Sequence, residues 1–362
     1  MRTENESEND NENKIEIRKL TQKEKALSRD LYEEVFSEDK GAFSDYYYRY
    51  RVPENTIYAA VDRIDSRDDG RAERKTKNRG WRYAEDCLDD SGQSGIKDGT
   101  KDGIKDRDKL RIHAMIHLNP VRVSWNGKTL DIPYFVAVAT EEKMRHRGLM
   151  RQLLTRIFQD LQKEGVPFCF LMPINEAIYL PFGFRRTWSF QWEEEVLLGR
   201  RIGAYERDDL WQISEGGAGC GHIEIESEET GAVRQADSGG FFCPAASPLP
   251  ESWGISCRAA DTVSDQILTR LSENVNQALA ERFELFTLRS CAYYRRLAAE
   301  QNASGGRLLI LFQGEEPLSA MQTARDDYPA MMCRVINEEA FARGQMGGSA
   351  DPFSSAFISE LV

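Results

Sequence analysis

The sequence of 362 residues lacks three features that mark particular classes of protein. It has seven cysteines but no Cys-x-x-Cys pair and no cysteine–histidine pairing at metal-ligand spacing, so we expect reduced thiols and no metal site. It has no run of about 18 apolar residues to span a membrane, and its polar first dozen residues do not resemble a signal peptide. Basic residues are not in excess, and the net charge of −12 argues against nucleic-acid binding. We therefore expect a cytoplasmic protein without a nucleic-acid or membrane partner.

Two stretches differ in composition from the rest of the chain. Residues 63–109 are charge-dense and Gly-rich and contain the near-repeat IKDG-TKDG-IKDR, and residues 215–261 are rich in Gly, Ser, Pro and Glu. Neither stretch has enough apolar residues to form a core, so we expect a flexible insertion and a linker there, and a disordered tail at 1–13. The remaining length is sufficient for two domains with separate cores.

The pattern of the first domain predicts the order β-α-(α)-β-β-β-α-β, with a sheet that is largely antiparallel before the last of these helices. The capping box Thr21–Glu24 opens a helix, and Asn126-Gly127 favours a two-residue hairpin turn. The aromatic cluster from Phe43 to Tyr50 predicts a short second helix, whose rings either line a pocket or pack in an interhelical core. The predicted strands are Ile15–Leu20, Asn55–Asp62, Leu110–Leu118, Arg122–Trp125 and Ile132–Ala139.

The stretch from Phe135 to Phe184 has the pattern of strand, loop, helix and strand. An apolar strand ends near Ala139, and the helix that begins near Gly148 has apolar residues at the spacing of one buried face. Gly165 ends this helix before a second buried strand, Val166–Met172. Because backbone N–H groups at a helix N-terminus have no intrahelical partner, this arrangement favours phosphate binding.

The pattern after Phe184 predicts further strands and helices. Strands are expected at Trp188–Val196 and Met331–Ile336, and a hairpin pairs Arg307–Phe312 with Leu318–Thr323. Helices are expected over Thr262–Arg282 and Leu288–Glu300. The last seven residues are apolar enough to dock on the rest of the protein.

These motifs resemble the GNAT acyl-CoA-dependent N-acetyltransferases, and more narrowly their Eis-type ("enhanced intracellular survival") branch. The residues that carry the resemblance are Arg145–Met150, which follow the family's Q/R-x-x-G-x-G/A motif except that Met150 replaces the small residue, together with the FLMP strand and Ile178–Phe184. The resemblance implies an α/β (α+β) fold: a GNAT domain with a mixed, largely antiparallel sheet, a second GNAT-like domain, and a strongly shortened C-terminal sterol-carrier-like remnant. It also implies acetyl-CoA as cosubstrate and association into oligomers.

Combined with the composition, the resemblance predicts four segments. Residues 1–13 are the tail, and 14–198 are the N-terminal GNAT domain with 63–109 inserted. Residues 199–330 form the second GNAT-like domain with 215–261 as linker, and 331–362 are the remnant with its docking tail.

The cofactor contacts that we expect are mostly made by the main chain. Backbone N–H groups from His146 to Arg151 would hold the pyrophosphate, and Val136–Val138 would run along the pantetheine arm, with an N–H near Val138 facing the developing oxyanion. Arginine side chains at the turn add charge-assisted contacts, and Asn175 is a further candidate. The predicted cofactor-binding residues are Val136, Ala137, Val138, Arg145, His146, Arg147, Gly148, Leu149, Met150, Arg151 and Asn175.

The resemblance assigns catalytic roles to Tyr179 and Val362. Tyr179 matches the family's general acid, which protonates the CoA thiolate. The branch uses its C-terminal carboxylate as general base, which here belongs to Val362; the rival carboxylate is Glu360. The reaction is acetyl transfer to a primary amine of a small molecule, peptide or protein lysine. The alternative is a catalytically weakened acyl-CoA-binding or assembly module, because the third domain is reduced and Met150 departs from the motif.

Overall fold

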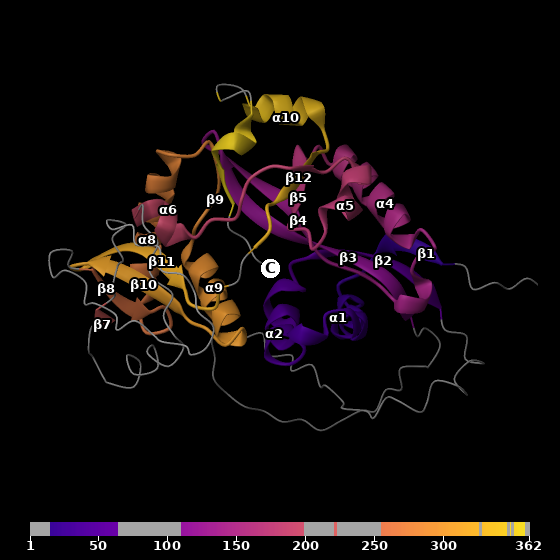
Figure 1. The fold of residues 1–362 in the computed structure, drawn as a ribbon, viewed down its shortest axis with the longest axis horizontal. Helices are drawn as coiled ribbons and strands as arrows, with labels where there is room; N and C mark the ends of the chain where they lie inside the picture. The colour runs from indigo at the N-terminus through magenta and orange to yellow at the C-terminus, as the bar shows by residue number, and fades with distance from the viewer. Residues whose placement is uncertain are drawn as a thin grey trace, which may run out of the picture.

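The computed structural model describes residues 15–63, 110–198, 221–222, 255–325, 328–345, 348 and 351–358. Within these residues the chain forms a mixed α/β fold around a large sheet (Figure 1). The main order of that sheet is β1-β2-β3-β4-β5-β12-β6, and β9 and β13 extend it beside β3. Its strands are β1 (Glu16–Lys19), β2 (Thr56–Arg63), β3 (Leu110–Trp125), β4 (Lys128–Thr140), β5 (Phe168–Leu171), β6 (Arg185–Arg186), β9 (Leu285–Thr287), β12 (Met332–Val335) and β13 (Ala356–Phe357).

The first four strands are antiparallel, and the parallel step from β4 to β5 requires the crossover helix α4 (Leu149–Lys163). The apolar face of α4 packs on one face of the sheet, where Leu153, Leu154 and Ile157 are fully buried. The other face is covered by α1 (Arg29–Val35) and α2 (Ala42–Tyr46), which Tyr47–Arg51 continues as one π-helical turn. The expected order β-α-(α)-β-β-β-α-β is confirmed, and the predicted strands Leu110–Leu118 and Arg122–Trp125 are one continuous strand, β3.

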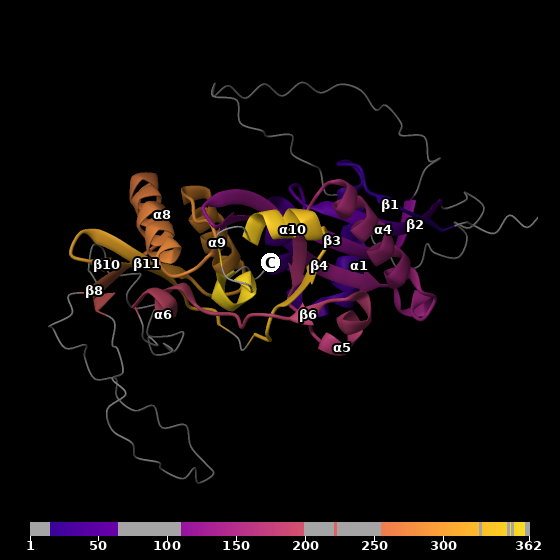
Figure 2. The same ribbon diagram turned by 90° about the horizontal axis from the view of Figure 1, so that it is seen from above.

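A second sheet in the described residues has the order β11-β10-β8-β7. Its apolar face packs against α8 (Asp265–Ala280) and α9 (Cys291–Ala303), and the predicted hairpin is confirmed by the pairing of β10 with β11. Figure 2 shows this part and the β1–α4 part at opposite ends of the molecule, with α10 (Glu338–Gln345) between them. The strands are β7 (Gly221–His222), β8 (Ile255–Ala259), β10 (Leu308–Gln313) and β11 (Glu316–Gln322).

The chain returns to the first sheet after the second one. Strand β12 pairs antiparallel with β5 and with β6, and β13 lies parallel to β9, which itself pairs with the end of β3. The segment that we assigned to a C-terminal remnant therefore contributes a strand to the N-terminal sheet, while the domain boundaries themselves stay a prediction.

The strand expected at Trp188–Val196 is wrong, because α6 occupies Glu193–Leu198. The alternating aromatic residues before it are not paired in a sheet. Trp188 is buried, and Phe190 and Trp192 contact each other and Tyr328. The period of two arose from rings that fill one aromatic cluster. The expected disordered tail and the expected insertion 63–109 lie almost entirely outside the described residues. The expected linker 215–261 is wrong in part, because its described residues include β7 and β8 of the second sheet.

Candidate functional site

Strands β4 and β5 pair over two residues and then separate. Tyr134 lies opposite Phe170 and Phe135 opposite Leu171, and no further pairing joins these two strands. Beyond that point β4 has a bulge against β3, where Ala137 has a φ of 49°. Val136–Val138 therefore border the opening between the two strands without a β5 partner. The contact of their main chain with the pantetheine arm, predicted from the sequence, stays a prediction.

The turn that opens α4 has two residues in left-handed conformation, His146 with φ 63° and Gly148 with φ 76°. The Gln152 N–H donates to the Gly148 carbonyl at 3.1 Å, so the N–H groups of Leu149, Met150 and Arg151 precede the helical ladder and have no intrahelical acceptor. A Cβ on Gly148 would meet no protein atom within 4 Å. Glycine is required there by its φ, and the space beside it is open for a ligand.

The side chains around this turn divide into two groups. Leu149 is buried in the core under α4 and Met150 packs against it, so these two residues present only their main chain. The side chains of Arg145, Arg147 and Arg151 are exposed, and the Arg151 guanidinium lies 5.3 Å from the centre of the Phe182 ring. A helix N-terminus surrounded by exposed guanidinium groups fits the pyrophosphate of acetyl-CoA.

Tyr179 ends the short helix α5 (Glu176–Tyr179), which follows β5. Asn175 caps this helix, since its side-chain oxygen accepts a hydrogen bond from the Ala177 N–H at 3.0 Å. The Tyr179 ring is 9% exposed and packs edge-on against Phe184 at 5.9 Å. Burial raises the pKa of Tyr179 to about 12, so the phenol keeps its proton at neutral pH and is a hydrogen-bond donor. Asn175 orients the candidate acid, whereas its predicted cofactor contact stays a prediction.

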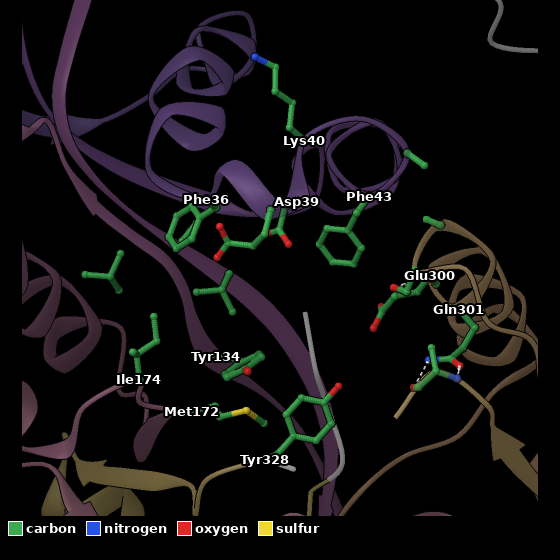
Figure 3. A pocket seen from close by; sticks show the side chains of 18 of the residues that line it. Phe36, Asp39, Lys40, Phe43, Tyr134, Met172, Ile174, Glu300, Gln301 and Tyr328 are labelled. Carbon is green, nitrogen blue, oxygen red and sulfur yellow. Dashed lines mark hydrogen bonds between the residues drawn. The ribbon is translucent and has the colours of Figure 1, made fainter. Parts of the chain in front are cut away.

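A cavity of about 680 Å³ extends from Tyr179 and β4 to the second half of the chain. Tyr179 and residues 134–138 of β4 form one side of it, and the segment from α1 to α2 forms another. The end of α9 and the residues after β11 complete the lining. Figure 3 shows Asp39 and Phe43 facing the same open space as Glu300 and Tyr328.

The charges that line this cavity are mostly negative. Asp39 accepts a hydrogen bond from the Tyr32 hydroxyl at 2.7 Å, and burial raises the pKa of this carboxyl above its ordinary value despite that bond. Glu300 is 5% exposed, and its Oε2 accepts a hydrogen bond from the Tyr46 hydroxyl at 2.8 Å. Glu38 is the third carboxylate.

Of the two basic side chains in the lining, Arg325 is already paired. It forms ion pairs with Glu194 and Glu195 and lies over the Trp192 ring. Lys40 is the other. The cavity as a whole therefore favours a cationic ligand.

The structure separates the residues that the sequence identified from those that it missed. Phe43 lines the cavity, but Tyr46 and Tyr47 are buried in the core, so the aromatic cluster mainly packs, as one of the two readings expected. Asp39 and Glu300 were missed, and no local pattern marks either of them. Val362 and Glu360 lie outside the described residues.

Residues 79–187 match the family model of the acetyltransferase (GNAT) domain, and no curated protein matches the sequence. The solved structures similar to the chain include a protein of unknown function from Enterococcus faecalis, described as a probable N-acyltransferase, with 11% identity, 91% of this chain and 74% of that chain covered, and a TM-score of 0.48. A GNAT family N-acetyltransferase from Escherichia coli in complex with CoA has 18% identity, 47% and 68% covered, and a TM-score of 0.30. A GNAT family acetyltransferase from Brucella melitensis in complex with acetyl-CoA has 13% identity and a TM-score of 0.29, with 48% of this chain and 84% of that chain covered.

The family match covers the β4–α4–β5 unit and Tyr179, the same elements that form the candidate site. The chain thus carries a GNAT acetyltransferase domain and is an acyltransferase. Acetyl-CoA is its cosubstrate, in agreement with the helix N-terminus and the separated strands described above. Among the described residues, no helix is long and apolar enough to cross a membrane.

Proposed function

We propose that the protein transfers an acetyl group from acetyl-CoA to a primary amine of a small molecule, a peptide or a protein lysine. The observation that carries the proposal is the single cavity in which Tyr179 and Val136–Val138 meet the carboxylates of Asp39 and Glu300. An acyl donor fits one side of this cavity and an ammonium group fits the other.

In the proposed reaction the amine nitrogen attacks the thioester carbonyl, a C–N bond forms and the C–S bond breaks. A main-chain N–H near Val138 stabilises the negative charge on the carbonyl oxygen. The Tyr179 hydroxyl gives its proton to the leaving thiolate. The proton lost by the amine goes to a carboxylate, for which Val362 stays the sequence-based expectation and Asp39, with its raised pKa, is the candidate within the cavity.

Three finer assignments belong to the same proposal. We assign the chain to the Eis-type branch on the motif Arg145–Met150 and the segment Ile178–Phe184. Action in the cytoplasm stays a prediction from the sequence. Association into oligomers is expected from the same resemblance.

The test measures CoA thiol release in the presence of acetyl-CoA and a panel of amines. Tyr179→Phe should lower kcat roughly a hundredfold, at the lower end of what general acid catalysis contributes. The matched control is Tyr58→Phe: burial also raises the pKa of Tyr58 to about 12, but its hydroxyl donates to Asp160 outside the cavity, so kcat should not change.

Turnover of no amine above the Tyr179→Phe background would refute the proposal. Binding of CoA without transfer would instead support the alternative of an acyl-CoA-binding module. Calorimetry with CoA, made on the same preparation, distinguishes these two results.

A further inference from the structure

Strand β12 reaches the candidate site from beyond the second sheet. It lies between β5 and β6, with Met332 opposite Leu171 on one side and Arg186 on the other. In this register Arg334 lies opposite Cys169 of β5. The strand therefore places a basic side chain beside the elements that carry the candidate acid and the cofactor helix.

Arg334 joins these two elements through contacts of different kinds. Its Nη1 donates a hydrogen bond to the carbonyl oxygen of Phe182, in the turn directly after α5. Its guanidinium lies over the ring of Phe158 on α4, 3.8 Å from the ring centre. The guanidinium also lies beside Gly183, since a Cβ added to this glycine would lie 3.6 Å from the Arg334 Nη1.

These contacts do not serve to balance a buried charge. Within the described residues no carboxylate forms an ion pair with Arg334, and burial lowers the pKa of its guanidinium. A guanidinium that donates to a carbonyl oxygen and stacks on a ring fixes the position of these two groups relative to each other. The planar, rigid guanidinium allows this, and the ammonium group of lysine does not.

The segment that carries Tyr179 needs such an anchor. Helix α5 is a single turn. The residues on either side of Tyr179, Ile178 and Leu180, are 46% and 55% exposed, so they contribute little packing. The Tyr179 ring is held through Phe184, which in turn contacts Phe158 at 6.0 Å between ring centres. Phe158 and the turn at Phe182 are the two groups that Arg334 binds.

We propose that Arg334 is a positioning residue of the acetyl transfer: it fixes the turn after α5 and thereby holds the Tyr179 hydroxyl at the cavity. Strand β12 is then part of the catalytic apparatus, although Arg334 lies 152 residues beyond Phe182 of this turn in the sequence. The inference rests on the proposed role of Tyr179 as general acid.

The test is a double-mutant cycle in the full-length protein. Arg334→Met keeps much of the aliphatic stem and removes the donor, and it should lower kcat roughly tenfold while the KM for the amine stays unchanged. In the Tyr179→Phe background the same substitution should lower kcat less than about twofold, because the acid that Arg334 positions is already absent. Arg334→Lys, which can still donate to the Phe182 carbonyl, should restore part of the activity.

Hydrogen exchange supplies a readout that does not depend on activity. Exchange of the peptide 176–184 should be faster in Arg334→Met than in the wild type at equal global stability. The matched control is Arg156→Ala, which removes an exposed pair with Asp160 on α4 and should leave both exchange and kcat unchanged.

Two outcomes would overturn the inference. An equal fall of kcat in both backgrounds would assign Arg334 a purely structural role, and unchanged exchange at 176–184 would exclude the anchor itself. Failure of the proposed function has a different signature, since a wild type without transfer, or a Tyr179→Phe variant with full kcat, contradicts the acid role while the exchange result still reports on the anchor.

Discussion

The burial of Tyr179 determines the pH range in which its phenol can act as an acid. Its pKa is raised from the ordinary value near 10 to about 12, so the proton needed by the thiolate is present throughout the range below that value. We expect kcat to rise with pH as the bound ammonium loses its proton, and then to stay level to about pH 10.5 instead of falling. The pH dependence of thiol release between pH 6 and pH 10.5 measures this. A descending limb near pH 9 that is absent in Tyr179→Phe would contradict it.

Gly148 offers a prediction that separates backbone strain from cofactor binding. Gly148→Ala forces a Cβ into a left-handed conformation without meeting any neighbour, and it should lower stability by about 1–2 kcal/mol. Because the same turn presents the N–H groups at the start of α4, the KM for acetyl-CoA should also rise.

The matched control is Gly165→Ala at the other end of the same helix. Gly165 has a φ of 71° and equal free space, so the loss of stability measured by urea unfolding should be similar. The KM for acetyl-CoA should not change in this variant. A rise of equal size in both variants would show that the Gly148 effect is a loss of stability alone.

The residues that could be found from the sequence are those whose function depends on the local chain. In the proposed function the turn at Gly148 and the strand at Val136–Val138 act through the main chain, whose position follows from element order and a glycine. The proposed roles of Asp39 and Glu300 depend on side chains that line one cavity although they lie far apart in the sequence. A single carboxylate on a helix surface has no period or spacing that marks it.

At the scale of elements, the turn before the 3₁₀ helix Lys25–Ser28 shows how one ion pair extends a capping motif. Glu24 accepts hydrogen bonds from the Thr21 N–H at 2.8 Å and from both Arg18 Nη atoms at 2.7 Å and 2.9 Å. The hydrogen bonds from Arg18 lower the pKa of Glu24 to about 2. This lowered pKa means that the carboxylate stabilises the folded state above its unfolded pKa, and that the stabilisation is lost as pH falls towards 2.

Glu24→Gln should therefore be less stable than the wild type at pH 7, with a difference that decreases from about pH 4.5 downwards. The midpoint of urea unfolding at several pH values measures this difference. Glu16→Gln is the control, because Glu16 is a more exposed partner 3.6 Å from the same Arg18 and should contribute little. A difference that is independent of pH would assign the Glu24 effect to packing.

Element positions were predictable wherever one face of the element is buried. The period of α4 and the hairpin at Asn126-Gly127 follow from the sequence because burial and turn geometry both act locally. The helix at Glu193–Leu198 was not predictable, since its first two acidic residues are buried by partners far away. Glu193 binds Arg289, and Glu194 binds Arg325. A run of glutamates predicts an exposed surface until those partners are known.

At the scale of the whole molecule, the cavity depends on the contact between α9, which packs on the second sheet, and the helices α1 and α2, which pack on the first. Figure 1 shows α9 beside α2, and Ala299 and Ala303 of α9 pack against the core cluster that contains α1 and α2. The Tyr46–Glu300 hydrogen bond joins the same two helices. The second half of the chain therefore completes the acceptor side of the cavity, whereas the turn at α4 lies entirely in the first half.

This division predicts that the two substrates respond differently to substitutions in the second half. Glu300→Gln removes a charge that would pair with the amine, and it should raise the KM for the amine roughly tenfold, the size of a charge-assisted hydrogen bond. The KM for acetyl-CoA should stay within about twofold, because Glu300 does not approach the α4 turn. Tyr46→Phe removes a hydrogen bond that positions this carboxylate, and it should have a smaller effect of the same sign.

Steady-state kinetics with each substrate varied in turn measures both constants, and Glu316→Gln is the matched control. Glu316 lies in the same half of the chain but binds Arg270 at the exposed end of β11, so neither KM should change. Equal increases of both constants in Glu300→Gln would indicate that the helix contact between α9 and α2 had loosened as a whole. An unchanged KM for the amine would remove Glu300 from the acceptor site, and the cation would then have to be held by Asp39 and the first half of the chain alone.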